Sequence, residues 1–397
     1  MARKLIRIGA LGALGALIGL TFALGPGPLK RDVPPTPNAP APGTQGGMLV
    51  VDLLDGAQEG DLKAIEAILG VDLDWTHELS RDEALAQGVV PNLAAAIAKL
   101  KGNPLVEVAE PEMMLEHFAF PDDPMYDQQW NMRAMGAPEG WAHSERGEGV
   151  IVAVIDTGVT KVEDLENTKI LKGATFVTGT KTSADDHGHG THVAGTIAQS
   201  TNNAKGVTGV APEATILPVK VLSRFGSGSS SGIAAGIDYA VDEGADVINL
   251  SLGGSYSRVI HTAIKKARAK GVIVVAAAGN SGRKGVGYPG ALAETIGVSA
   301  TGPDGQIAPY SSWGKGVDIA APGGDKRKPG GGVLQDTVDG SGGHQYAEYQ
   351  GTSMAAPHVA GAAAVLLSQG MPPDSVERAL LDNARPEKDV ERFGSGH

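Results

Sequence analysis

The sequence predicts an α/β domain with a mostly parallel central sheet, preceded by a small α+β domain. From residue 149 onward, uninterrupted apolar runs alternate with helical stretches. Such strands are buried on both faces, which is typical of a parallel sheet with helices on either side. Residues 48–118 differ, with short strand-like runs around two helical segments. We expect a small antiparallel sheet with two helices there.

Composition excludes several classes of function. The chain of 397 residues carries a formal net charge of −12 and contains no cysteine. A negative charge without a basic stripe argues against nucleic acid as a partner. The lack of cysteine excludes disulfides, thiol catalysis and zinc sites built from thiolates.

The first 47 residues predict an export signal followed by a spacer. Arg3, Lys4 and Arg7 precede an uncharged apolar run over 8–24, which is the pattern of a secretory signal over residues 1–25. The run is close to the minimum length for a membrane span, so an uncleaved anchor is the alternative. Residues 26–47 are rich in proline and glycine and predict an extended linker. We therefore expect a secreted protein.

The elements of both domains can be placed in order along the chain. In the small domain we expect strands at 48–53, 106–108 and 113–115, and helices at 61–69 and 91–101. In the large domain we expect strands at 150–155, 215–222, 246–250, 272–277, 295–299 and 317–320. The helices between them are expected at 191–199, 230–243 and 259–270. Functional sites of such sheets lie at the carboxyl ends of the strands.

A serine opens a later helix that is rich in alanine. Ser353 follows the small-residue turn Gly351-Thr352, and the apolar run after it continues to Leu367. In the first turn of a helix, free backbone N–H groups and the positive end of the helix dipole favour a developing negative charge. Ser353 is therefore a candidate nucleophile. A serine that only caps the helix is the alternative.

Two polar residues follow strands of the predicted sheet. Asp156 comes directly after the run 150–155, and Asn280 lies just beyond the run 272–277. Both are therefore expected at the carboxyl edge of the sheet, where a site would form. The alternatives are a turn or capping role for Asp156 and an ordinary turn role for Asn280.

Three histidines lie close together ahead of a helix of small residues. They are His187, His189 and His192, and Asp185 and Asp186 precede them. Such a group could hold a metal ion. The spacing is not the His-Glu-x-x-His of a zinc protease, and glycines separate the imidazoles. A zinc site is therefore the less favoured hypothesis.

Three of these segments together resemble the subtilisin-like serine proteases, or subtilases. They are Asp156-Thr157-Gly158, the stretch 189–196 that begins His-Gly-Thr-His, and the stretch 351–358 around Ser353. Their order, Asp then His then Ser, is that of subtilisin. The resemblance covers about residues 122–365. It implies a three-layer subtilisin-like fold over residues 119–397 and a serine endopeptidase; a non-catalytic exported peptide-binding protein on the same fold is the alternative.

The resemblance implies a role for each residue of the site. Ser353 would be the nucleophile, His189 the general base, and Asp156 the carboxylate that orients the imidazole. Asn280 would donate to the oxyanion together with the backbone N–H of Ser353. His192 and His358 would be structural, because both lie within helices that pack on the sheet.

The resemblance also implies where a peptide would bind. Two segments, residues 226–228 and 251–253, would bind the peptide backbone as an added strand, so the sequence specificity of cleavage should be broad. Gly287 would leave the floor of the primary pocket open to a large apolar or aromatic side chain. The short loop 281–286 departs from the most familiar members by carrying Arg283 and Lys284. The implied substrate-binding residues are Ser251, Leu252, Gly253, Gly226, Ser227, Gly228, Ala278, Gly279 and Gly287.

A structural calcium ion (Ca2+) is the cofactor that the resemblance implies. Asp123, Asp164 and Asn203 would contribute ligands, and oxygen donors of this kind suit calcium. A solvated, asparagine-rich turn is the alternative for the loop 201–205.

The layout of the chain resembles that of a secreted zymogen. Residues 48–118 would be a propeptide that assists folding and then inhibits the site. Its end would lie in the cleft with Phe118 in the open pocket, so we expect the first autoprocessing cut between Phe118 and Ala119. The expected partners are protein or peptide substrates and the chain's own propeptide, and we expect a monomer.

Overall fold

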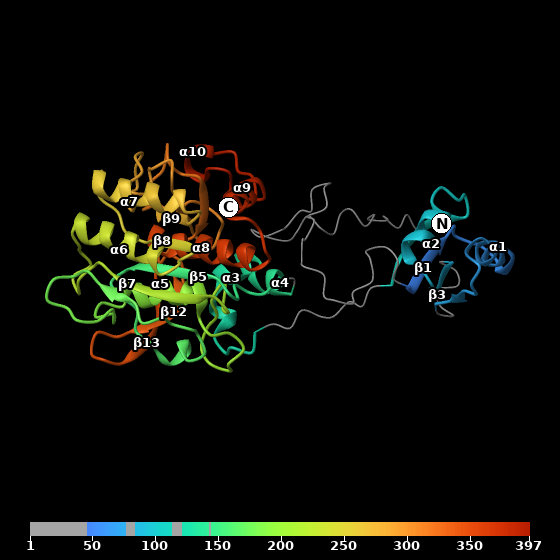
Figure 1. Cartoon of the computed structure of the whole chain (residues 1–397), viewed down its shortest axis with the longest axis horizontal. Coiled ribbons are helices and arrows are strands. Elements are labelled where there is room, and N and C mark those ends of the chain that lie inside the picture. The colour runs from blue at the N-terminus through green and yellow to red at the C-terminus, as the bar shows by residue number, and fades with distance from the viewer. Residues whose placement is uncertain (1–45, 77–83, 113–120, 143) are drawn as a thin grey trace. The chain divides into compact units, whose positions relative to one another are not determined.

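The computed structural model describes residues 46–76, 84–112, 121–142 and 144–397. They form two compact units, one before residue 113 and one after residue 120, and each is described by itself (Figure 1). The predicted signal, nearly all of the linker, the strand at 113–115 and the cut after Phe118 lie outside these residues. Among the helices that are described, none combines the length and the apolar character needed to cross a membrane.

The small unit has the antiparallel sheet and two helices that its sequence predicts. Its elements are β1 (Gly47–Leu53), α1 (Glu59–Leu69), β2 (Asp74–Trp75), β3 (Leu85–Val90), α2 (Leu93–Leu100) and β4 (Val106–Pro111). The strands lie in the order β2-β3-β1-β4, and each pairing is antiparallel. Leu49, Val51 and Leu53 of β1 are fully buried, because alternate residues of a strand face the same side. The strands β2 and β3 were not predicted.

The large unit contains every strand and helix that its sequence predicts, each within two residues of the expected bounds. Its strands are β5 (Ile151–Asp156), β6 (Ala174–Thr175), β7 (Thr215–Lys220), β8 (Val247–Leu250), β9 (Ile273–Ala277), β10 (Ile296–Thr301), β11 (Ile319–Pro322), β12 (Val333–Val338) and β13 (His344–Tyr349). Its helices include α3 (Trp130–Met135), α4 (Ala137–Trp141), α5 (His189–Ala198), α6 (Ser230–Asp242), α7 (Arg258–Ala269), α8 (Thr352–Ser368), α9 (Pro373–Asp382) and α10 (Val390–Phe393).

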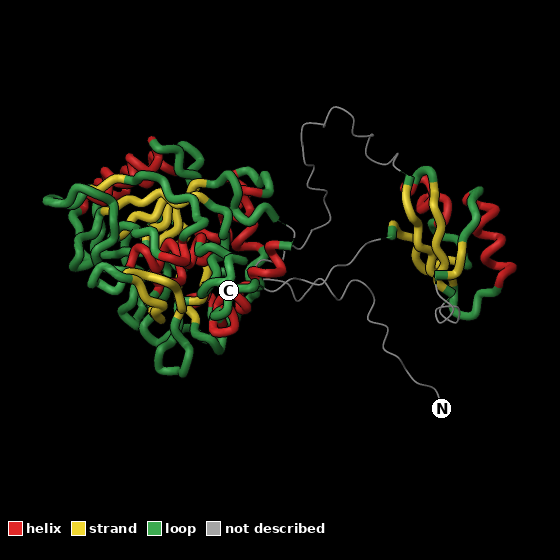
Figure 2. The backbone as a smooth tube through the Cα atoms, turned by 90° about the horizontal axis from the view of Figure 1, so that it is seen from below, coloured by secondary structure: helices red, strands yellow, loops and turns green. Residues whose placement is uncertain are grey.

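Seven parallel strands form the middle layer of this unit, in the order β11-β10-β9-β8-β5-β7-β6. Helices α6 and α7 cover one face and α5 and α8 the other (Figure 1), so the strands lie in the interior (Figure 2). Val152 and Val154 of β5 belong to the apolar cluster of α5 and α8, whereas Ala153 and Ile155 belong to that of α6 and α7. The period of two therefore gives β5 two apolar faces, and the fold is the predicted three-layer α/β arrangement.

The winding of the sheet reverses at β5. The chain adds β7 and β6 on one side of β5, and β8, β9, β10 and β11 on the other. Open α/β sheets bind ligands outside the carboxyl ends of the strands at such a reversal. Asp156 is the last residue of β5 and so lies at that position.

The hairpin of β12 and β13 lies outside the central sheet and was not predicted from the sequence. The ring of His192 in α5 stacks on Tyr349 at the end of β13, with ring centroids 4.3 Å apart. The Thr337 hydroxyl of β12 donates to the carbonyl of Gly188. Because Gly188 directly precedes His189, the hairpin supports the segment that leads into α5.

Candidate active site

Ser353 is the second residue of α8, in the first turn, as its sequence predicts. The helical bond to its carbonyl would come from the N–H of residue 357, which is proline and has none. The Ser251 hydroxyl takes this place and donates to the Ser353 carbonyl at 2.7 Å. The Ser353 hydroxyl in turn donates to the Ser251 carbonyl at 3.2 Å. These two bonds join the start of α8 to the segment after β8.

His189 and Asp156 form a hydrogen-bonded pair at the site. His189 begins α5, and its Nδ1 lies 2.7 Å from Oδ1 of Asp156, which is fully buried. An unprotonated carboxylate only accepts, so Nδ1–H is the donor and Nε2 is left as an acceptor. Burial lowers the pKa of His189, but the charge of Asp156, its hydrogen bond and the charge of Asp185 outweigh burial and raise the pKa above the ordinary value.

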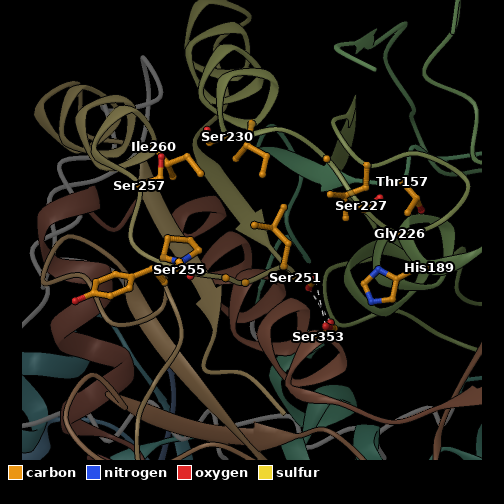
Figure 3. A pocket seen from close by; sticks show the side chains of 18 of the residues that line it. Thr157, His189, Gly226, Ser227, Ser230, Ser251, Ser255, Ser257, Ile260 and Ser353 are labelled. Atoms are coloured by element: carbon orange, nitrogen blue, oxygen red, sulfur yellow. Dashed lines mark hydrogen bonds between the residues drawn. The ribbon is translucent and has the colours of Figure 1, made fainter. Parts of the chain in front are cut away.

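His189 and Ser353 line the same cavity (Figure 3). No hydrogen bond joins them within the described part of the chain, because the Ser353 hydroxyl donates to Ser251 instead. Hydrogen bonds between catalytic groups are often long or absent without substrate and form in the complex. The two side chains thus line one cavity without a hydrogen bond to each other.

Asn280 lies beside the start of α8 with its amide held in one orientation. Its Oδ1 accepts from the backbone N–H of Thr352 at 2.9 Å and from the Thr352 hydroxyl at 3.0 Å. Since Oδ1 faces Thr352, the Nδ2 group is turned away from Thr352. Asn280 and Ser353 line one cavity, and neither Nδ2 of Asn280 nor the Ser353 backbone N–H bonds to another described residue. Two donors are therefore available beside the serine hydroxyl.

A first cavity of about 570 Å³ lies between the two segments predicted to bind substrate. Gly226, Ser227 and Gly228 form one side and Ser251, Leu252 and Gly253 the other. Leu252 was predicted to bind substrate. Three further apolar residues of the lining were not predicted: Leu222, Ile233 of α6 and Ile260 of α7.

A second cavity of about 790 Å³ lies on the other side of the segment 252–254 and also reaches Ser353. Gly279 and Gly287 line it, as predicted. Ala278 does not: it is fully buried, and its carbonyl accepts from the N–H of Gly287 at 2.9 Å, while Ala277 lines the cavity instead. A β-carbon added at Gly287 would meet no atom closer than 3.7 Å. The cavity is therefore open at this position.

Two of the other predicted histidines, His192 and His358, are buried and neutral, whereas His187 is exposed. His192 Nε2 donates to the carbonyls of Val333 and Ala347, at 2.9 and 3.1 Å, and burial lowers its pKa to about 3. His358 Nδ1 donates to the Met354 carbonyl at 2.7 Å, and burial lowers its pKa to about 4. Among the described residues, no three His, Asp or Glu side chains converge as metal ligands would. These contacts favour structural roles over a zinc site.

The predicted calcium ligands lie together around the loop after α5. Asp123 and Asp164 are 3% and 0% exposed. Asp123 accepts from the N–H groups of Asn202 and Asn203, and Asp164 from the N–H of Val207 at 2.9 Å and Nδ2 of Asn203 at 3.0 Å. Burial, followed by the charges of nearby carboxylates, raises the pKa of Asp164 to about 7.

Two buried carboxylates facing one loop are a donor set that a hard cation fits, because it would offset their repulsion. The Asn203 amide points its nitrogen to Asp164, and its oxygen accepts from the N–H of Lys205. Asn203 would therefore have to rotate its amide to become a ligand.

Comparison with known proteins identifies the family. The subtilase family (peptidase S8) matches residues 147–396. The chain is 44% identical over 271 residues to subtilisin Savinase of Lederbergia lenta, covering 67% of this chain and 95% of that protein. It is 40% identical over 297 residues to a thermophilic serine proteinase of Bacillus sp. (strain AK1), covering 74% of this chain and 71% of that protein.

Solved structures agree with this result. A protease from Pseudoalteromonas arctica PAMC 21717 superposes with a TM-score of 0.65 at 35% identity, over 70% of this chain and 96% of that one. A cold-adapted subtilisin-like serine proteinase gives a TM-score of 0.55 at 35% identity, over 62% of this chain and 86% of that one. From its sequence, its fold and these matches, the chain belongs to the subtilase family and is a serine endopeptidase.

Proposed function

We propose that this protein hydrolyses peptide bonds through Ser353, His189 and Asp156, with an acyl-enzyme as intermediate. The observation that carries the proposal is the 2.7 Å hydrogen bond between His189 Nδ1 and Asp156, at the wall of the cavity that Ser353 shares. It fixes the tautomer in which Nε2 is a base.

In the first step Ser353 Oγ attacks the substrate carbonyl carbon. His189 Nε2 takes the hydroxyl proton, and the buried charge of Asp156 stabilises the imidazolium that results. The carbonyl oxygen becomes an oxyanion, which accepts from the Ser353 backbone N–H and from Nδ2 of Asn280. His189 then gives its proton to the leaving amine, and water hydrolyses the acyl-enzyme by the same steps in reverse.

The substrate would bind as an extended strand between the segments 226–228 and 251–253. Backbone pairing recognises no particular sequence, so broad specificity is expected. The second cavity would receive the side chain before the scissile bond, and its open floor at Gly287 suits a large apolar or aromatic one. The first cavity, lined by Leu222, Ile233 and Ile260, would take an apolar side chain further from the bond.

The small unit would act as the propeptide of a secreted zymogen. It is compact and has its own apolar core, as a separately folding inhibitor requires. We propose that the signal directs export, that the small unit occupies the cleft until it is cut off, and that the mature enzyme is a monomer.

Labelling with a fluorophosphonate tests the assignment of the site. The reagent reacts only with a serine activated as a nucleophile. We expect one label in the chain, located on Ser353 by mass mapping of peptides. His189→Ala, which removes the base, should label far more slowly. A label on another residue would refute the assignment.

We propose that a calcium ion stabilises the large unit, with Asp123 and Asp164 as ligands and Asn203 after rotation of its amide. An ion that binds only the folded state stabilises it by mass action. A calcium concentration about 100-fold above the dissociation constant adds about 2.7 kcal/mol, or about 5–10 °C in melting temperature for a domain of this size. Calorimetry of the Ser353→Ala protein, with calcium or EDTA, measures this without self-digestion.

Two neighbouring carboxylates provide a matched comparison in the Ser353→Ala background. Asp164→Asn should abolish the response to calcium, because it removes a buried ligand. Glu163→Gln should retain it, because the exposed Glu163 side chain pairs with Lys205 and His344 instead. Equal melting temperatures in calcium and EDTA would contradict the proposal.

A further inference from the structure

The second cavity beside Ser353 carries an unbalanced positive charge. Its lining includes two cationic side chains, Arg283 and Lys284, and no aspartate or glutamate. The remaining lining is uncharged, with several glycines and the hydroxyl groups of Ser281, Ser312 and Thr352. None of the lining residues therefore supplies a carboxylate to offset these two positive charges.

Only one of the two cations is neutralised. Lys284 forms an ion pair with Glu391, and its Nζ lies 5.5 Å from the centroid of the Trp313 ring. Arg283 is exposed and makes no ion pair with any residue that the structure describes. The unpaired positive charge of the cavity is thus that of Arg283.

The loop that carries Arg283 is fixed at several points. The Arg283 carbonyl accepts from the N–H of Trp313 at 3.3 Å. On either side, the N–H of Gly282 donates to the carbonyl of Tyr310 at 2.7 Å, and the N–H of Gly285 donates to the carbonyl of Trp313 at 2.8 Å. The backbone at Arg283 is therefore held at the cavity while its guanidinium is free to meet a ligand.

We propose that Arg283 determines specificity, by letting the cavity accept an acidic side chain before the scissile bond and disfavour a basic one. The guanidinium can bind a carboxylate with two parallel hydrogen bonds. A large apolar side chain of the substrate would still enter over Gly287. Acceptance of acidic side chains at the same position would therefore add to the range of substrates. This inference rests on the proposed function, in which the second cavity receives that side chain.

The test compares two peptides that differ only in the residue before the scissile bond. Glutamate and glutamine have the same shape, so the ratio of their kcat/KM values reports charge alone. In Arg283→Ala the glutamate-to-glutamine ratio should fall about fivefold, the upper range for an exposed charge pair. Arg283→Lys should keep most of the ratio. Salt of about 1 M, where the screening length is about 3 Å, should reduce the wild-type ratio.

Arg224 provides the matched control. It is exposed, its guanidinium lies 4.8 Å from the centroid of the Phe225 ring, and it lines neither cavity of the cleft. Arg224→Ala removes the same charge and should leave the ratio unchanged. The inference would be overturned by an equal fall of the glutamate-to-glutamine ratio in both alanine variants, or by an unchanged ratio in Arg283→Ala. In either case, cleavage of both peptides would still support the proposed function. If the wild-type enzyme cleaves neither peptide but cleaves the matching peptide with phenylalanine at that position, the inference fails and the proposed function stands; cleavage of none of the three would overturn both.

Discussion

Replacing Ser353 with alanine is expected to reduce peptidase activity about 10⁶-fold, the loss that removal of the nucleophile causes in subtilisin itself. The backbone N–H of residue 353 and Asn280 remain in this variant, but no atom is left to form the acyl-enzyme. The fold should persist, because the Ser251 hydroxyl can still donate to the carbonyl of residue 353. Turnover of a chromogenic peptide measures the loss, and the melting temperature measures the fold.

The same variant tests the proposed processing of the small unit. Purified Ser353→Ala protein should keep residues 48–118 attached, whereas the mature wild-type chain should begin at Ala119. N-terminal sequencing distinguishes the two. Cleavage of the purified variant without added protease would show that another residue or enzyme does the cutting. A wild-type chain that begins elsewhere, without later trimming in a time course, would refute the expected cut.

Asn280→Ala is expected to lower kcat by about 10²–10³-fold, which is the effect of losing this kind of oxyanion donor in subtilisin. KM should change little, because the donor would bind the oxyanion and not the ground-state carbonyl. Steady-state kinetics separate the two constants. An unchanged kcat would remove Asn280 from the site.

A second substitution separates the lost donor from the lost anchor. Asn280 Oδ1 also holds the N–H and hydroxyl of Thr352, so alanine could act by loosening the start of α8. Asn280→Asp keeps an oxygen facing Thr352 and replaces the Nδ2 donor with a negative oxygen. We expect the kcat of Asn280→Asp to be at least as low as that of Asn280→Ala. Nearly normal turnover in Asn280→Asp would show that the anchor matters and the donor does not.

Local sequence determined most of the central architecture. Runs such as 150–155 and 272–277 are apolar at every position, so both faces of each strand can be buried. Each of these runs forms a parallel strand within two residues of its predicted bounds. The positions of Asp156 and Asn280 at strand ends and of Ser353 at a helix start follow from these elements. Such features depend on neighbours along the chain, so their periodicity and turn residues are visible in the sequence.

The hairpin of β12 and β13 could not be predicted in this way. Gln335, Asp336 and Thr337 are fully buried although they are polar, so β12 lacks an apolar pattern. Their burial depends on partners distant in sequence, such as Thr208 for the Gln335 amide and Gly188 for the Thr337 hydroxyl. The unpaired charge of Arg283 likewise depends on which distant residues approach the loop: Glu391 pairs with Lys284, and none of the acidic residues that the structure describes pairs with Arg283.

The fine geometry of the site was also decided by the tertiary structure. Pro357 frees the Ser353 carbonyl locally, but the hydroxyl that binds it comes from Ser251, 102 residues earlier. The orientation of the Asn280 amide depends on Thr352, 72 residues later. The sequence by itself determined which elements form and which side chains stand at their ends. Only the packing of those elements decided which donors and acceptors meet, because hydrogen bonds depend on distance in space and not on separation along the chain.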